Sequence, residues 1–276
     1  MLTWIGVSWR TASSGRRASL RELDALVPGG LAIHTCARDA WLVDGDGSAL
    51  TGALAARGFS AQELDSRSDR AAVDRLLAVA VGLDSAVQGE ADVGRQVRAA
   101  LGVGNTRVTA ILDHVLARLL RQGRLDGWVR EGHGVASLAV GAVEGHAQVG
   151  VIGAGLVGAQ VARALGERGL LYNRTPRPGT QSLATLEPVD AWIVATSAAS
   201  AWFRPPEPYR LLIDLGHPAQ AIDDSRRVSL DALLIGAEAR LDPALLHAAQ
   251  FAVRCATDDV FERLARRIAS DDRVSA

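Results

Sequence analysis

The chain contains no lysine, since all 30 of its basic residues are arginine. A P-loop lysine, a Schiff-base lysine and a lysine general base are therefore excluded. Cys36 and Cys255 are too few for a disulfide framework or a cysteine-based metal cluster, and the histidine spacing predicts no metal site. The net charge of −1 gives no general attraction to nucleic acid, so any RNA contact must use a local basic patch. No membrane-spanning run or secretory leader is visible, and we expect a soluble, cytoplasmic protein.

A glycine motif lies near the middle of the chain. The apolar run 149–152 leads into glycines at G-x-G-x-x-G spacing, and a helix is predicted over 159–165. The first glycine permits a tight turn, the second lets a pyrophosphate approach the backbone, and the third lets helix and strand pack closely. The N–H groups at the helix start can bind phosphate. We therefore predict a dinucleotide site formed by Gly153, Gly155, Leu156, Val157 and Gly158.

The next predicted strand indicates which dinucleotide binds. A site for NAD usually has an acidic residue at the end of this strand, where it accepts hydrogen bonds from the ribose 2′-hydroxyl. Here the strand ends in Asn173, Arg174 and Thr175. A guanidinium and a hydroxyl suit a 2′-phosphate, so NADPH is predicted, with Thr196 near the nicotinamide. The alternative is that Arg174 is a solvated turn residue.

The expected elements divide the chain into three parts. Residues 1–145 mix strands and helices as an α+β catalytic domain does, and residues 146–228 alternate strand and helix as a doubly wound Rossmann NADP-binding domain does. Residues 229–276 should form a short helical tail, so the fold class is α/β overall. In the first part the expected strands are 2–7, 30–34 and 40–43, and the expected helices are 20–26, 49–57, 70–83, 93–101, 107–125 and 135–144.

Cys36 is the candidate nucleophile. It follows the predicted strand 30–34 and lies between His34 and Arg38, whose side chains would share its face if the chain stayed extended. A neighbouring imidazole and guanidinium lower the pKa of a thiol and favour the nucleophilic thiolate. The alternative is a buried, inert cysteine.

Several motifs occur in a defined order along the chain. Ser8-Trp-Arg-Thr-Ala12, His34-Thr-Cys-Ala-Arg38, Val81-Gly-Leu-Asp-Ser-Ala-Val-Gln-Gly-Glu90 and Gly94-Arg-Gln-Val97 precede the glycine motif. In this order they resemble the glutamyl-tRNA reductase family, NADPH-dependent enzymes that open the five-carbon route to tetrapyrroles. The resemblance covers roughly residues 2 to 225, and Gly-Leu-Asp-Ser followed by Gly-Glu is its most specific part.

The resemblance implies a two-step reaction. The family's cysteine, matched by Cys36, attacks the ester that joins glutamate to its tRNA, and hydride from NADPH reduces the resulting thioester to glutamate-1-semialdehyde. Arg38 matches the arginine that pairs with the substrate carboxylate, while Thr35, Ser85 and Glu90 match substrate-site positions. The implied partners are an aminoacyl-tRNA, expected to be glutamyl-tRNA, and a protein that receives the aldehyde.

Two departures concern the catalytic site. Ala37 replaces an asparagine, and Arg75 takes the position of the family's motif histidine. An arginine can stabilise an oxyanion but does not transfer a proton at neutral pH. We therefore predict that His34, beside Cys36, partly replaces that histidine; the alternative is a packed structural residue.

The end of the sequence also departs from the family, whose members continue into a spinal helix and a dimerisation domain. Residues 229–276 are expected to be a truncated spinal helix in a short member without that domain, and the oligomeric state is open. Three other functions remain open: a reductase of another aminoacyl-tRNA or thioester, a non-catalytic paralogue that binds NADP or tRNA, and a simple NADP-dependent dehydrogenase.

Overall fold

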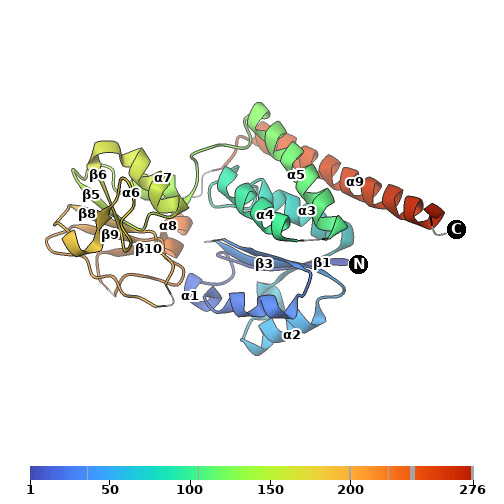
Figure 1. Cartoon of the computed structure of the whole chain (residues 1–276), viewed down its shortest axis with the longest axis horizontal. Helices are drawn as coiled ribbons and strands as arrows, with labels where there is room; N and C mark the ends of the chain where they lie inside the picture. Colours follow the sequence, from blue (N-terminus) through green and yellow to red (C-terminus); the bar gives the residue numbers. More distant parts are fainter. Residues whose placement is uncertain (36, 105, 199, 223, 237–239, 275–276) are drawn as a thin grey trace. The chain divides into compact units, whose positions relative to one another are not determined.

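The chain forms two compact α/β units in a computed structural model that describes residues 1–35, 37–104, 106–198, 200–222, 224–236 and 240–274 (Figure 1). The first unit contains residues 1–12, 19–131 and 239–276, and the second contains 13–18 and 132–238. These divisions differ from the predicted boundaries after residues 145 and 228. The difference arises because the helix that follows residue 134 packs within the second unit, and the C-terminal helix packs within the first.

The first unit is built on a four-stranded antiparallel sheet with strand order β2-β3-β1-β4. Its strands are β1 (Leu2–Ser8), β2 (Leu31–His34), β3 (Arg38–Asp44) and β4 (Asp65–Ser68). The sequence predicts the first three but not β4, because Asp-Ser-Arg-Ser has no apolar residue to produce an alternating pattern. Pairing with β1 makes this polar segment an edge strand.

Helices cover both faces of this sheet (Figure 1). On one face lie α3 (Asp69–Ala80) and α4 (Ala91–Val103), with α5 (Arg107–Asp126) packed on α4. On the other face lie η1 (Leu20–Leu26) and α2 (Ser48–Ala56). The helix predicted over 20–26 is present as the 3-10 helix η1.

The C-terminal helix α9 (Pro243–Val274) packs along α3 and α5 (Figure 1). It buries Ala249, Val253 and Val260 in the larger apolar core of the unit, together with Leu76 and Leu116. The predicted tail is therefore helical and forms part of the first unit. Among the described residues, no helix has the length and apolar character needed to cross a bilayer.

The second unit is built on a six-stranded parallel sheet with strand order β10-β9-β8-β5-β6-β7. Its strands are β5 (Val149–Ile152), β6 (Gly169–Asn173), β7 (Gln181–Ser182), β8 (Ala191–Val194), β9 (Leu211–Asp214) and β10 (Arg227–Ser229), and its helices include α6 (Val135–Ala142), α7 (Leu156–Leu165) and α8 (Leu230–Gly236). The strand order reverses at β5, where doubly wound sheets place their ligand crevice. The loops after β5, β6 and β8 therefore share the edge at which a nucleotide would bind.

Candidate active site and nucleotide-binding loop

Cys36 lies outside the described residues, so the site is built from its neighbours. Thr35 and Arg38 are both 6% exposed, which is unusual for polar side chains. The Thr35 N–H donates to the Arg38 carbonyl at 2.8 Å, and the Ala37 N–H donates to Thr35 Oγ1 at 3.2 Å. The backbone on either side of the predicted nucleophile is thus held by hydrogen bonds.

His34 and Arg38 lie on opposite faces of the sheet. In the antiparallel pair β2–β3, His34 is opposite Asp39, so its side chain shares the face of Asp39 and Trp41. Arg38 is opposite Ser8 of β1 and shares the other face, with Ala40 and Leu42. The expectation of a common face is wrong, because the two residues belong to separate antiparallel strands rather than to one extended segment.

Both ring nitrogens of His34 contact carboxylates. Nδ1 lies 2.7 Å from Asp39 Oδ1, and Nε2 lies 3.0 Å from each carboxylate oxygen of Asp24, which also accepts a hydrogen bond from Trp41. Burial alone would lower the pKa of His34, but the hydrogen bond to Asp39 and the charges of both aspartates raise it. To transfer a proton, as the sequence suggests, His34 would have to leave one of these carboxylates.

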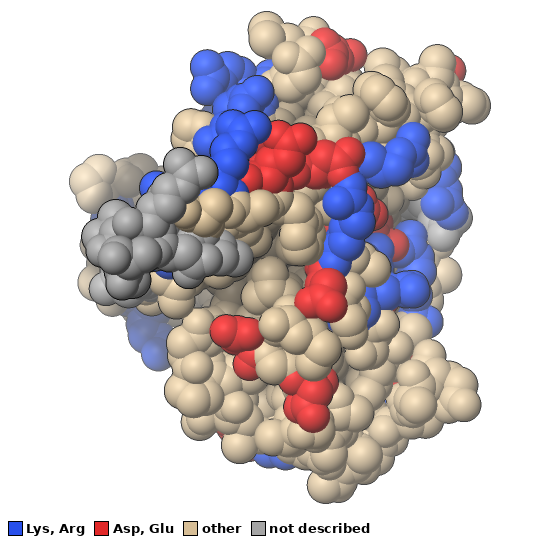
Figure 2. All heavy atoms as spheres, turned by 90° about the vertical axis from the view of Figure 1, so that its right-hand side faces the viewer, with Lys and Arg blue, Asp and Glu red and all other residues tan. Residues whose placement is uncertain are grey.

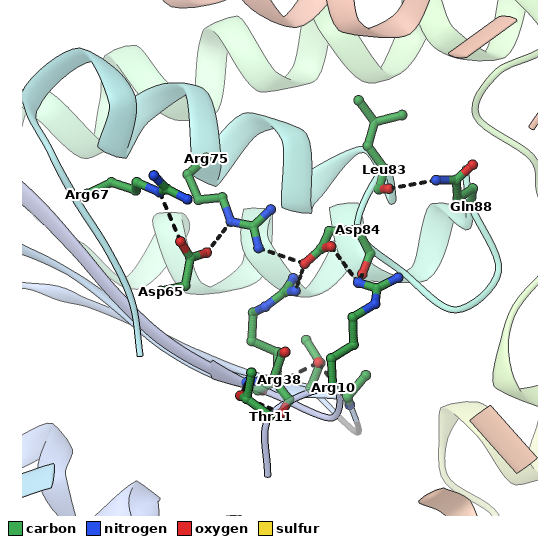
Figure 3. A network of polar contacts seen from close by, with 12 residues as sticks. Arg10, Thr11, Arg38, Asp65, Arg67, Arg75, Leu83, Asp84 and Gln88 are labelled. Carbon is green, nitrogen blue, oxygen red and sulfur yellow. Dashed lines mark hydrogen bonds and ion pairs between the residues drawn. The ribbon is translucent and has the colours of Figure 1, made fainter. Parts of the chain in front are cut away.

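On the face opposite to His34, three arginines converge on Asp84 (Figure 3). Arg38 from β3 forms a buried ion pair with it, Arg75 from α3 lies 2.7 Å away, and Arg10 after β1 lies 2.5 Å away. Arg75 is also paired with Asp65 on β4. Two carboxylates therefore hold Arg75, the residue at the position of the family's histidine.

This cluster lines a pocket of about 280 Å³ between β1, β4 and α3. Its charged lining residues are Arg10, Arg38, Arg67 and Arg75 together with Glu63, Asp65 and Asp84. Four guanidinium groups face three carboxylates, which leaves the pocket with an excess of positive charge. On the face seen in Figure 2, basic and acidic side chains lie next to one another. An anionic group is the ligand that this charge distribution favours.

Burial and charge together set the ionisation of the cluster. Burial lowers the pKa of Arg38 to about 10, although the nearby Asp84 opposes this shift. For Asp84, burial would raise the pKa, but Arg38, Arg75 and Arg10 hold it below its ordinary value. Both groups are therefore charged at neutral pH, and the buried cation is compensated.

The sequence indicates Arg38 and Arg75 as site residues but not their partners. Asp84 occurs in the Gly-Leu-Asp-Ser motif, which is the one signal that could have found it. Arg10 likewise occurs in the Ser8-Trp-Arg-Thr-Ala12 motif, whereas Asp65 and Arg67 have no such signal because they lie on the unpredicted strand β4. Their grouping depends on the pairing of β4 with β1.

The loop 81–90 positions the remaining substrate-site candidates. Gly82 has φ of +75°, and a Cβ there would lie 2.7 Å from the Glu90 nitrogen; Gly89 has φ of +81°, and a Cβ there would lie 2.3 Å from the Trp128 carbonyl oxygen. Both positions therefore require glycine. The tight loop buries Ser85 and Glu90, each of which is 7% exposed. Burial raises the pKa of Glu90 to about 7, although Ser85 and Arg38 act in the opposite direction.

The glycine motif forms the turn between β5 and α7. A Cβ on Gly158 would lie 1.8 Å from the Gly153 carbonyl oxygen, and Gly153 itself has φ of +105°. By contrast, a Cβ on Gly155 would meet no atom within 4 Å, so its backbone faces open space at the start of α7. Leu156 is 52% exposed and Val157 half-buried at that helix start. The turn thus leaves room for a phosphate beside free helix N–H groups.

The predicted 2′-phosphate residues lie after β6. Asn173 accepts a hydrogen bond from the Ala154 N–H at 3.4 Å and donates to the Thr175 carbonyl at 2.7 Å, which links this segment to the glycine turn. Arg174 and Thr175 are exposed, and the Arg174 guanidinium lies 5.7 Å from the ring centre of Trp202. Thr196, after β8, contacts the buried Gln220 at 3.4 Å. These residues meet at the same edge of the sheet as Gly155.

Comparisons with known proteins place the first unit in context. Residues 8–124 match the family profile described as the N-terminal domain of glutamyl-tRNAGlu reductase. Glutamyl-tRNA reductase 2 from a Nocardioides species is 37% identical over 177 residues, which cover 55% of this chain and 39% of that protein. The match thus spans well under half of the relative's length. It is the segment 8–124 that carries Arg38, Asp84 and Glu90.

Two solved structures align at lower identity. Glutamyl-tRNA reductase from Methanopyrus kandleri aligns with 99% of this chain and 81% of its own, with 19% identity and a TM-score of 0.44. The nucleotide-binding domain of glutamyl-tRNA reductase from Thermoplasma volcanium aligns with 38% of this chain and 91% of its own, with 18% identity and a TM-score of 0.34.

Proposed function

The chain belongs to the glutamyl-tRNA reductase family, and on that premise we propose that it reduces an aminoacyl-tRNA to an amino aldehyde with NADPH, glutamyl-tRNA being the first candidate substrate. The observation that carries this proposal is the buried guanidinium of Arg38, two residues from Cys36, at a pocket with excess positive charge. An acyl group that ends in a carboxylate would be attracted to this pocket while its ester carbon lies at the thiol.

Cys36 acts as the nucleophile in this proposal. Its thiolate attacks the ester carbonyl, the C–S bond forms, and the C–O bond to the ribose of the tRNA breaks. Arg38 and Arg10 orient the acyl side chain, while Arg75 raises the positive potential of the pocket without transferring protons. Thr35 positions the backbone beside the nucleophile.

The second unit would hold the cofactor. The open space at Gly155 and the helix start at Leu156 and Val157 suit a pyrophosphate, and the exposed Arg174 and Thr175 suit a 2′-phosphate. NADPH bound there would supply the hydride that converts the thioester to the aldehyde. Asn173 would keep the segment that carries these residues fixed against the glycine turn.

One observation favours a second candidate function. Arg75 and its two aspartates occupy the position where the family has a histidine, which changes the shape and charge of the acyl pocket. A reductase for a different acidic aminoacyl-tRNA or thioester is therefore the alternative. If this change abolishes proton transfer, the chain would instead be a non-catalytic protein that binds NADP or tRNA.

Single-turnover incubation with charged tRNAs tests the proposal. Without NADPH, glutamyl-tRNA should leave a glutamyl group on Cys36, which mass spectrometry of the peptide would detect, and Cys36→Ala should abolish it. The matched control Cys255→Ala removes the exposed cysteine on α9 and should leave acylation intact. Acylation by another charged tRNA alone would change the substrate, and no acylation by any would support the non-catalytic alternative.

A further inference from the structure

Arg174 carries an exposed positive charge at the edge of the sheet where a nucleotide would bind. Among the described residues, its guanidinium contacts the ring of Trp202, 5.7 Å from the ring centre, and pairs with no carboxylate. Its charge is therefore free to attract the 2′-phosphate of a dinucleotide. An exposed arginine side chain has many rotamers, however, and fixing one of them on binding costs free energy. A residue that holds the guanidinium beforehand would strengthen the binding of the phosphate.

The ring of Trp202 is placed to hold this guanidinium. A cation within about 6 Å of an aromatic ring centre is attracted by the negative face of the ring, and tryptophan attracts it most strongly. Trp202 is half-buried, so part of the indole remains open to the exposed guanidinium. The indole also contacts the buried Phe203, with ring centres 5.7 Å apart and planes at 71°. The ring therefore has a fixed partner inside the unit and an exposed partner in Arg174.

Hydrogen bonds to Gln220 fix the orientation of the indole. The backbone N–H of Trp202 donates to the Gln220 carbonyl at 2.8 Å, and the indole Nε1 donates to Gln220 Oε1 at 3.3 Å. Gln220 is fully buried, and its side-chain amide donates to the carbonyls of Ala198 and Pro218 at 2.9 and 2.6 Å. The Gln220 backbone N–H donates to Asp214 at the end of β9, at 2.8 Å. The indole is thus connected to a strand of the sheet through a buried residue whose hydrogen bonds are satisfied.

The contact between Arg174 and Trp202 joins two segments that follow the strands on either side of β5. Arg174 follows β6, Trp202 lies after β8, and β5, which leads into the glycine turn, lies between these strands in the sheet. Asn173 ties the Arg174 segment to this turn by accepting a hydrogen bond from the Ala154 N–H. The guanidinium is therefore held beside the strand end at which the ribose of a dinucleotide is bound in this fold.

We propose that Trp202 is a positioning residue for cofactor selectivity, because its ring holds the Arg174 guanidinium where the 2′-phosphate of NADPH would bind. This inference rests on the proposed function and adds a residue that the sequence did not indicate. Trp202 itself makes no bond with the cofactor. NADH has a hydroxyl in place of the phosphate, so the position of Arg174 should matter little for its affinity.

Binding of NADPH and of NADH to the full chain, measured by isothermal titration calorimetry without tRNA, tests this proposal. The substitution Trp202→Leu keeps an apolar side chain but removes the aromatic face. It should weaken NADPH binding about threefold to fivefold, which corresponds to one cation–π contact at an exposed site, and leave the affinity for NADH nearly unchanged. Trp202→Phe keeps an aromatic face and should retain most of the preference for NADPH.

Two controls separate the position of the guanidinium from general effects. In Arg174→Ala the guanidinium is absent, so adding Trp202→Leu should cause no further loss of NADPH affinity. The matched control is Phe261→Leu on α9, because the Arg70 guanidinium lies 5.9 Å from that ring centre in the first unit. This substitution removes the same kind of contact and should leave the affinities for both cofactors unchanged.

The inference is overturned if Trp202→Leu keeps the ratio of NADPH to NADH affinity within about 1.5-fold of the parent, since one cation–π contact is worth more than that. An equal loss for both cofactors, or a further loss in the Arg174→Ala background, overturns it as well, because Trp202 would then contact the shared adenosine or support the fold. A parent that binds NADH as tightly as NADPH, or binds neither, also refutes it. A parent that shows the expected selectivity, yet is acylated by no charged tRNA, supports the inference and refutes the proposed function.

Discussion

Replacing Asp84 with asparagine should strongly destabilise the first unit, because its carboxylate forms ion pairs with three guanidinium groups. The side chain of Arg38 is 7% exposed and that of Asp84 is 21% exposed, so the pair is largely shielded from water. Breaking a buried ion pair costs about 3–5 kcal/mol. The amide oxygen of the introduced asparagine would still accept one hydrogen bond, and Asp84 is partly hydrated, so we expect a loss of about 2–4 kcal/mol in the free energy of unfolding.

The effect should depend on pH with a definite sign. The arginines hold the pKa of Asp84 below its ordinary value of 3.8, so the ionised carboxylate stabilises the fold above that value. This contribution is lost as the pH falls through the lower pKa of the folded state. The difference in the free energy of unfolding between Asp84→Asn and the parent should therefore be largest at neutral pH and become smaller at acidic pH.

Urea denaturation followed by circular dichroism at several pH values measures both effects. The matched control is Asp113→Asn, because Asp113 also accepts two hydrogen bonds from an arginine, Arg98, at 2.8 and 3.1 Å, but at an exposed site. It should cost less than about 1 kcal/mol. The assigned role of Asp84 is wrong if Asp84→Asn loses no more free energy of unfolding than the control does. It is also wrong if the loss does not change with pH.

Two further predictions concern the nucleotide-binding loop. Gly158→Ala places a Cβ 1.8 Å from the Gly153 carbonyl oxygen, so the turn must open, and NADPH affinity by fluorescence titration should fall by at least about tenfold. Gly141→Ala, on an exposed face of α6 with no atom within 4 Å, is the control and should be neutral or stabilising. Arg174→Ala should weaken NADPH by about tenfold and leave NADH nearly unchanged, because only NADPH carries the 2′-phosphate. An equal loss for both cofactors would refute this assignment.

Local patterns in the sequence determined much of the fold. The glycine spacing predicts the β5–α7 turn because a strand, a turn and a helix are adjacent in the chain. Gly153 and Gly158 are required by close contacts, one across the neighbouring strand and one within the turn. Apolar periodicity likewise predicts α3 and α5, since each helix buries a stripe that repeats within its own length. Motif order by itself indicated the resemblance to the family whose N-terminal-domain profile matches residues 8–124.

Only the tertiary structure decided which residues share a site. His34 and Arg38 are four positions apart, yet the pairing of β2 with β3 places them on opposite faces. Asp84 contacts Arg38, which is 46 positions away in the sequence, and Arg10, which is 74 positions away. Contacts between residues so far apart leave no periodic pattern in the sequence. The register of β4 against β1 brings Asp65 beside Arg75 in the same way. A sequence specifies the contacts that repeat along one element, whereas the charge balance of this pocket arises from segments that meet only after the sheet has formed.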